Sequence, residues 1–230
     1  MKVSFKLNKD TYIISDNHFY HKNILKYEPV RTELINNSKQ NTQEKLMKQL
    51  WNETVSNEDE IICLGDIYFG GVKEFKKFSI LGELSGQKHL LMGNHDNLTI
   101  TRYNEMGFNV VGKEGLILSE SILKDQKMLK EISKIKKQHN DIKKRLFYFI
   151  IQDFGDKRVM FTHFPIKSNS DYDNKYQPIV DVLYKIFELT NCDYNIHGHT
   201  HSKNIEDKRI INVSAEIIGL KPIKISKLLK

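Results

Sequence analysis

Five short clusters of histidine, aspartate and asparagine recur along the chain, and these residue types are common ligands of divalent metal ions. The clusters occupy residues 15–18 (SDNH), 65–66 (GD), 93–96 (GNHD), 162–163 (TH) and 197–201 (HGHTH). Each follows a short apolar segment that is typical of a strand, at residues 12–14, 61–64, 89–92, 159–161 and 194–196. Because loops at strand ends commonly carry function, we expect the clusters to form one site at the edge of a sheet.

The clusters supply seven candidate ligands, which is more than one tetrahedral ion needs. These are Asp16, His18, Asp66, Asn94, His163, His199 and His201. They fit two divalent ions about 3.5–4 Å apart that share one carboxylate. Mixed imidazole and oxygen ligands without thiolate favour transition metals over calcium or magnesium, with manganese preferred and iron, zinc or nickel as alternatives.

A pair of such ions suits the hydrolysis of phosphate esters. A water that bridges the two ions loses a proton near neutral pH, and the same ions hold the phosphoryl oxygens for in-line attack. The departing alkoxide then needs a proton, which a histidine outside the ligand set can donate. We assign this role to His95, with Asp96 placed to orient it from behind.

The segments that must position these residues alternate between short strands and amphipathic helices, which indicates an α/β fold. A length of 230 residues suits one domain, residues 1–230. Residues 119–146 contain no glycine or proline and carry an apolar stripe between lysine and glutamate residues. We interpret them as a helical insertion, either one long helix or two joined by a turn near residues 138–140.

Two interpretations of the insertion remain open. Its stripe either packs on the main domain, or it projects to cap the active site or to pair with a second subunit as a homo-oligomer. We favour packing or self-association over a catalytic role.

The composition limits the partners and the location. A net charge of +7 and a pI of about 9.1 favour anionic substrates, including nucleic acid. Only five of the 36 basic residues are arginine, however, so much of this charge is expected on solvated lysine faces. No apolar segment is long enough to span a membrane and the N-terminus lacks a signal-peptide core, so we expect a cytoplasmic protein without a membrane partner.

The clusters, taken in this order, resemble those of the calcineurin-like metallophosphoesterases, especially small bacterial and bacteriophage members. The opening run SDNHFYHKNI at residues 15–24 is similar to their first motif, and NVS at 212–214 and KPI at 221–223 are similar to their last strands. The resemblance covers nearly the whole chain apart from the insertion. It implies a two-sheet mixed β-sandwich flanked by helices, in four layers, with the metals at the strand ends.

The resemblance also implies a role for each site residue. Asp16, His18, Asp66 and His201 would hold the first metal, and Asp66 would bridge to a second metal held by Asn94, His163 and His199. His95 would protonate the leaving group with the support of Asp96, and His197 would support the ligands. The residues expected on the substrate side are His21, Asn23 and Arg31.

These patterns predict a dimetal hydrolase that acts as a phosphodiesterase on a nucleotide-type or other small phosphodiester. A DNA or RNA nuclease and a phosphomonoesterase are the alternatives within the same chemistry. A non-catalytic metal-binding scaffold, with the insertion as its docking element, is the alternative from another class. The complete ligand set and the presence of His95 argue against the scaffold.

Overall fold

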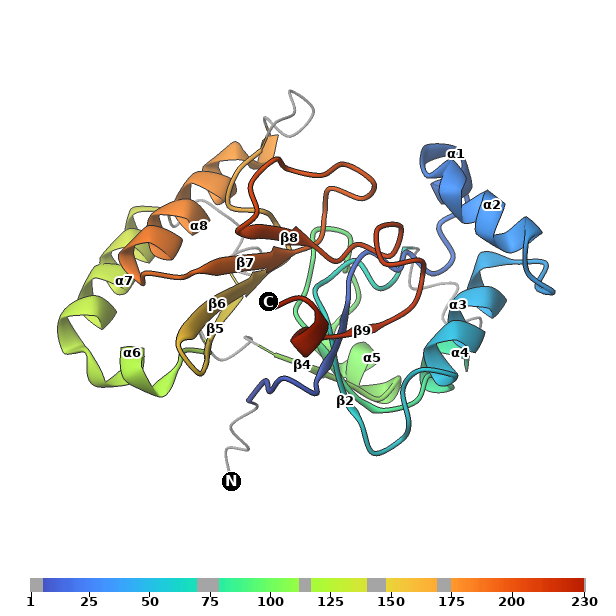
Figure 1. Ribbon diagram of the computed structural model, residues 1–230, viewed down its shortest axis with the longest axis horizontal. Helices are drawn as coiled ribbons and strands as arrows, with labels where there is room; N and C mark the ends of the chain where they lie inside the picture. The colour runs from blue at the N-terminus through green and yellow to red at the C-terminus, as the bar shows by residue number, and fades with distance from the viewer. Residues whose placement is uncertain (1–5, 70–78, 112–116, 140–147, 169–174, 230) are drawn as a thin grey trace.

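The computed structural model describes residues 6–69, 79–111, 117–139, 148–168 and 175–229, and its strands form two sheets that face each other (Figure 1). The first sheet has the order β4-β3-β2-β1-β9, with β1 to β4 parallel and β9 antiparallel to β1. Its strands are β1 (Tyr12–Ile14), β2 (Glu60–Cys63), β3 (Gln87–Leu90), β4 (Phe108–Val110) and β9 (Ile223–Lys224).

The second sheet has the order β5-β6-β7-β8. β5 is antiparallel to β6, whereas β6, β7 and β8 run parallel, so both sheets are mixed. Its strands are β5 (Phe149–Phe154), β6 (Lys157–Thr162), β7 (Tyr194–His197) and β8 (Ile210–Asn212). The predicted pair of mixed sheets is therefore confirmed.

Alternation along the strands divides the buried side chains between two faces, since successive side chains of a strand point to opposite sides. In β2, Ile61 and Cys63 pack against the helices on the outer face of the first sheet, whereas Ile62 faces the second sheet. In β6, Met160 packs against the helices on the outer face of the second sheet, and Phe161 packs between the two sheets. Continuous apolar strands of this kind are required when both faces are covered.

Helices cover the outer face of each sheet and complete four layers (Figure 1). The helices are α1 (Ile24–Tyr27), α2 (Pro29–Asn36), α3 (Gln43–Asn52), α4 (Ser79–Gly82), α5 (Ile100–Glu105), α6 (Glu120–Lys124), α7 (Gln126–Gln138) and α8 (Gln177–Leu189), and a 3-10 turn spans Ile225–Lys227. Apolar side chains of α3 and α5 join the hydrophobic cluster on the outer face of the first sheet, and those of α7 and α8 join the cluster on the outer face of the second sheet.

The described residues of the predicted insertion form two helices that are separated at Asp125, and the second of them ends at Gln138, where the sequence predicts a turn. Asp125 caps α7 because its side chain accepts a hydrogen bond from the backbone N–H of Met128 at 2.9 Å, an N-cap that the apolar periodicity conceals. Ile122 and Ile132 are buried in the cluster beneath α8, so the apolar stripe packs on the second sheet's helix layer. Residues 140–146 of the predicted insertion lie outside the described residues.

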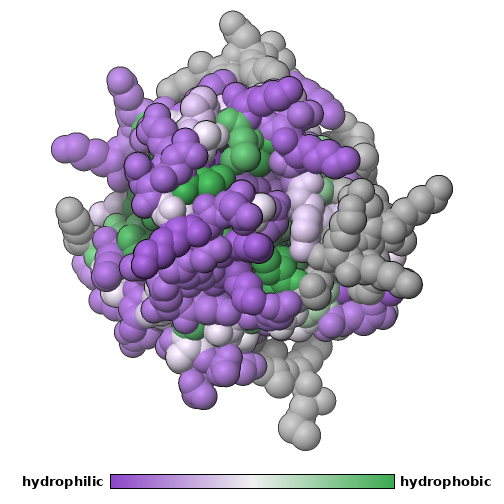
Figure 2. All heavy atoms as spheres, turned by 90° about the vertical axis from the view of Figure 1, so that its right-hand side faces the viewer, coloured by the Kyte–Doolittle hydropathy of each residue, from purple (hydrophilic) through white to green (hydrophobic). Residues whose placement is uncertain are grey.

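The molecular face that carries the helices of the first sheet is mainly hydrophilic, with small and separate hydrophobic areas (Figure 2). Among the described helices, none combines the length and the apolar character needed to cross a bilayer.

Trp51 tests the packing of the first sheet, because its ring is 1% exposed and its indole N–H donates to the Ser85 carbonyl at 2.9 Å. Trp51→Ala should lower the free energy of unfolding by about 3–5 kcal/mol through the cavity it leaves. Trp51→Phe should cost only about 1–2 kcal/mol, since it keeps most of the apolar contact and loses the hydrogen bond. Urea unfolding followed by far-UV circular dichroism measures both; equal losses would contradict a tightly packed site.

Candidate metal centre

The loops that follow the strands of both sheets meet at one end of the sandwich. Parallel strands place their carboxyl ends at the same edge, so the residues after β1 and β2 are neighbours, as are those after β6 and β7. Main-chain bonds then join the two edges: the N–H of Ser15 donates to the Val213 carbonyl at 3.0 Å, and the N–H of Ala215 donates to the Ser15 carbonyl at 2.9 Å.

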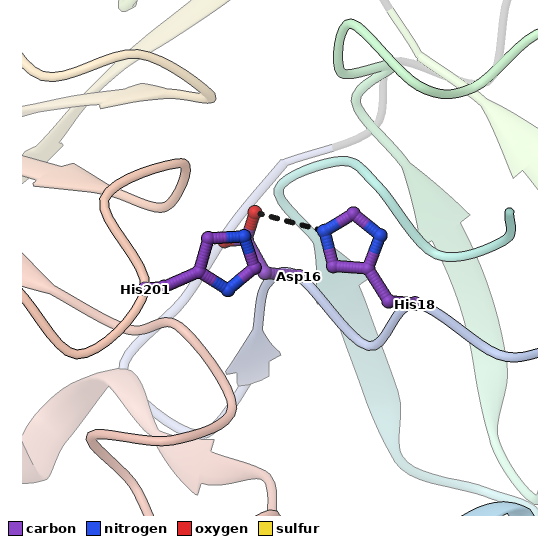
Figure 3. A group of neighbouring side chains, drawn as sticks. All are labelled: Asp16, His18 and His201. Carbon is purple, nitrogen blue, oxygen red and sulfur yellow. Dashed lines mark ion pairs between the residues drawn. The ribbon is translucent and has the colours of Figure 1, made fainter. Parts of the chain in front are cut away.

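One group of candidate ligands consists of Asp16, His18 and His201, whose ligand atoms lie within 4.8 Å of one another (Figure 3). Asp16 and His18 are buried and follow β1, whereas His201 comes from the loop after β7 and is half-buried. The Nε2 atom of His18 lies 4.0 Å from Oδ1 of Asp16. The first and last predicted clusters therefore meet in space.

A second group joins Asp16 to Asp66 and His163, again within 4.8 Å. Oδ2 of Asp66 lies 3.8 Å from Nε2 of His18 and 3.5 Å from Nε2 of His163. Oδ1 of Asn94 lies 3.0 Å from the same nitrogen of His163. The Asp66 carboxylate thus stands between two imidazoles from different loops, where one carboxylate could serve two ions.

His199 completes the predicted set. Its backbone N–H donates to Oδ2 of Asp16 at 2.8 Å, and its ring centroid lies 5.2 Å from that of His163. The structure therefore brings all seven predicted ligands to one place, although metal binding by them stays a prediction.

The donor atoms that converge here have the chemistry of a cation site. His163 donates Nδ1–H to the Leu64 carbonyl at 2.8 Å, so Nε2 is the atom that faces the oxygens of Asp66 and Asn94 and that can bind an ion once it has lost its proton. Within the described part of the chain, Oδ1 of Asp16 and Nε2 of His18 are buried without a hydrogen-bond partner. Leaving such groups unpaired costs about 1–3 kcal/mol each, and divalent ions would satisfy them.

The backbone at these positions is strained. Of the eight described non-glycine residues with positive φ, five are candidate ligands: Asp16 at 55°, His18 at 50°, Asp66 at 53°, His199 at 69° and His201 at 50°. Such conformations cost about 1–3 kcal/mol each and persist where the surrounding structure enforces them. The sharp bends let residues at i and i+2 turn both side chains toward one point.

Two glycines make the close approach of the loops possible. A Cβ on Gly93 would overlap with Oδ1 of Asp66 and lie 2.8 Å from Cε1 of His163. A Cβ on Gly198 would overlap with Oγ of Ser15 and Oδ2 of Asp16. Any larger residue at either position would push the ligand loops apart.

Burial and neighbouring charges set the protonation of the ligands. Burial lowers the pKa of His18 to about 3, so its ring is neutral at pH 7. Burial opposes ionisation of Asp66, but the adjacent His163 lowers the pKa of this carboxyl overall. Burial likewise opposes charge on His163, but the Asp66 carboxylate raises the pKa of His163 to about 9. A proton therefore occupies this pair when no cation does.

The predicted acid His95 lies beside the first group, with its ring centroid 5.5 Å from that of His18. Its backbone N–H donates to Oδ1 of Asp66 at 2.8 Å, and its side chain is only half-buried. Burial lowers the pKa of His95, while the Asp66 carboxylate opposes the shift. The ring thus stands at the rim of the centre and is open to a substrate.

Asp96 is fully buried and holds two loops together. Its Oδ2 accepts hydrogen bonds from the N–H groups of Asp66 at 2.7 Å and Gly93 at 2.8 Å. Its Oδ1 accepts from the N–H of Ile67 and the hydroxyl of Tyr103. These contacts make Asp96 a positioning residue for the metal loops, and its predicted contact with the His95 ring stays a prediction.

The substrate side differs from the sequence prediction at one residue. His21 is half-buried and Asn23 is exposed, so both are accessible. Arg31 is 0% exposed, and the substrate role predicted for it is wrong. Its guanidinium donates to the backbone carbonyls of Asp16 and Asn17 and to the side chains of Gln43 and Glu216. Every N–H is engaged, so Arg31 braces the loop after β1.

Glu216 is a residue of the centre that the sequence did not predict, and it contacts the candidate ligand His201. Its Oε1 accepts a hydrogen bond from Nδ1 of His201 at 3.1 Å, which leaves Nε2 of His201 available for an ion. His201 also lies within 4.8 Å of Glu28 and Glu216 as a third group of potential ligands. Because Arg31 pairs with Glu216, we assign this carboxylate to orienting His201. The signal available in the sequence was an acidic residue soon after the apolar run of β8.

Comparison with known proteins agrees with this arrangement. Over residues 10–203 the chain matches the calcineurin-like phosphoesterase family. An uncharacterized protein of Methanocaldococcus jannaschii is 23% identical over 228 residues, which cover 95% of this chain and 89% of that protein. A solved structure of a protein of unknown function from Aquifex aeolicus is also 23% identical and covers 95% of this chain and 96% of its own, with a TM-score of 0.63.

The family match spans most of the chain and includes all five clusters, so the chain belongs to the calcineurin-like phosphoesterase family. The Aquifex aeolicus structure shows that the fold is shared.

Asp66→Asn should weaken the binding of both ions, because the shared negative charge is removed while the shape is kept. Metal content after loading with manganese and gel filtration, measured by mass spectrometry of the elements, should fall from two ions per chain to one or none. Asp10→Asn is the matched control, since the Asp10 side chain is 85% exposed and pairs with Lys224, which is not a candidate ligand. Two retained ions in Asp66→Asn would contradict the bridging position.

Metal binding should release about one proton per chain at pH 7, because His163 has a pKa of about 9 and must lose its proton to become a ligand. The affinity of the protein for manganese should therefore rise with pH between about 6 and 8, by up to about tenfold per pH unit. Calorimetric titration with manganese in buffers of different ionisation enthalpy measures the released protons. Binding without proton release would contradict the His163–Asp66 pairing.

Proposed function

We propose that this protein is a metal-dependent phosphodiesterase that hydrolyses a nucleotide-type or other small phosphodiester. The observation that carries the proposal is the position of Asp66 between His18 and His163, beside Oδ1 of Asp16 and Nε2 of His18, which are buried without hydrogen-bond partners. Membership of the calcineurin-like phosphoesterase family supports ester hydrolysis at phosphorus.

Each candidate ligand has a role in this proposal. Asp16, His18, Asp66 and His201 hold one ion, and Asp66, Asn94, His163 and His199 hold the other. When bound, the two ions, preferably manganese, supply an activated water and neutralise charge on the phosphoryl oxygens. The oxygen- and nitrogen-rich ligand set without sulfur supports this choice of metal.

His95 supplies the proton that the departing alcohol requires. Its half-exposed ring lies beside His18, at the rim of the ligand set, where an ester oxygen can reach it. Its backbone is tied to Oδ1 of Asp66, so the proton donor and the bridging carboxylate keep a fixed relation. Asp96 maintains that relation by binding the N–H groups of both loops. Protonation of the leaving oxygen by a positioned histidine typically contributes about 10²–10⁴-fold.

A diester substrate is favoured over a monoester by the resemblance to small members of the family, and not by His95, because either ester releases an alkoxide that needs a proton. The net charge of +7 supports an anionic substrate such as a nucleotide, and leaves a nuclease acting on DNA or RNA as the second candidate. A cytoplasmic location and self-association through α6 and α7 are further predictions of the sequence.

Turnover with added manganese separates these candidates. A bis-aryl phosphate should be hydrolysed faster than the aryl monoester if the protein is a phosphodiesterase, and the reverse order would identify a phosphatase. Labelled single- and double-stranded DNA and RNA at low salt test the nuclease. Two bound ions without turnover of any of these substrates would indicate a metal-binding scaffold and would contradict the proposal.

His95→Asn should slow substrates with poor leaving groups most, by about 10²–10⁴-fold in kcat, because they depend on proton donation. Activated aryl esters should lose much less, since their leaving groups need no proton. Steady-state rates for a series of diesters with leaving groups of increasing pKa measure the difference. His139→Asn, at the end of α7, is the control. An equal loss for all leaving groups would argue against an acid role.

A further inference from the structure

Phe69 is an apolar side chain in polar surroundings. Its ring centroid lies 3.9 Å from that of His21, 5.0 Å from that of His95 and 6.1 Å from that of His18. It is half-buried and is not among the described side chains of the three hydrophobic clusters. Packing of the core therefore does not account for a phenyl ring at the rim of the metal centre.

The backbone holds Phe69 in this position. Its N–H donates to the Phe19 carbonyl at 3.0 Å, and the preceding residue, Tyr68, forms a bridge with Phe19. Phe19 and Tyr68 are both buried in the first cluster. The ring is thus carried by a rigid pair of segments, which is the arrangement a binding group needs.

His21 and Tyr27 extend the aromatic surface toward solvent. The ring of His21 lies edge-on to that of Tyr27, with centroids 6.0 Å apart, and Nδ1 of His21 accepts a hydrogen bond from the N–H of Asn23. Tyr27 is 66% exposed, more than any other exposed large apolar or aromatic side chain described. A row of rings therefore runs from His95 through Phe69 and His21 to Tyr27.

The rings on the other side of the centre differ in kind. Phe164 lies 4.4 Å from His199 between ring centroids, but it is 1% exposed and belongs to the second cluster. Tyr176 packs against the same cluster. Those rings are explained by the core, whereas Phe69 and Tyr27 are not.

We infer that Phe69, His21 and Tyr27 form a subsite that stacks a planar aromatic ring, such as a nucleobase, carried by the departing alcohol of the substrate. The inference rests on the proposed phosphodiesterase function. Phe69 contacts His95, the proposed proton donor. A base stacked on Phe69 would therefore bring the ester oxygen of the same alcohol next to His95. Aromatic side chains bind bases through their flat faces with little preference for sequence, and the imidazole of His21 adds a third flat surface.

The test compares adenosine 5′-monophosphate with ribose 5-phosphate, which share the phosphate and the sugar and differ in the base. Calorimetric titration of the manganese-loaded protein should show the nucleotide binding at least about tenfold more tightly, the effect expected from stacking of one base. Phe69→Ala should reduce the ratio to near one and Tyr27→Ala should reduce it in part. Affinity for ribose 5-phosphate should stay unchanged in both.

Two further variants separate stacking from disturbance of the site. Phe69→Tyr keeps the ring and should keep the ratio, whereas Phe69→Leu keeps apolar volume and should lose it. Tyr184→Ala is the matched control, since Tyr184 is a 39% exposed tyrosine on α8. Metal content is measured for every variant, so a loss of ions is seen directly.

A nucleotide-to-ribose-phosphate ratio near one in the unchanged protein, or a ratio that survives in Phe69→Ala and Phe69→Leu, would overturn the inference. Hydrolysis of bis-aryl phosphate is followed in parallel. Turnover with a ratio of one would refute the aromatic subsite alone, whereas absence of turnover on every substrate would refute the proposed function and leave the ratio as a test of the subsite.

Discussion

The carboxylate of Asp66 is the group on which the rest of the centre depends. It is 1% exposed and lies within 4 Å of imidazole nitrogens from two different loops, one after β1 and one after β6. A buried anion surrounded by neutral lone pairs is unfavourable unless a cation or a proton joins them. The raised pKa of His163 shows the proton in that role, and metal ions would replace it.

The fold serves this constraint by bringing strand ends from two sheets to one place. Parallel pairing of β1 with β2 and of β6 with β7 aligns the loops within each sheet, and hydrogen bonds between the loops join the sheets. The strained backbone at the ligands is maintained by buried braces, chiefly Arg31 on the loop after β1 and Asp96 on the loop after β2. Apolar packing between the two sheets, and between each sheet and its helices, supplies the stability that such strain requires.

Much of this could be predicted because the signals are local. Apolar runs of three or four residues followed by polar clusters indicate strands with functional loops, and glycine at 93 and 198 marks close approach. The features that were missed depend on contacts between distant segments. Arg31 resembles a surface arginine in sequence, and only its four partners, up to 185 positions away, show that it is buried. Glu216 and Phe69 gain their roles from His201 and His95 in the same way.

The most direct test of the account is anomalous X-ray diffraction from crystals of the protein soaked in manganese. The account predicts two anomalous peaks about 3.5–4 Å apart, one on each side of the Asp66 carboxylate. A single peak, or peaks that do not share Asp66, would contradict it.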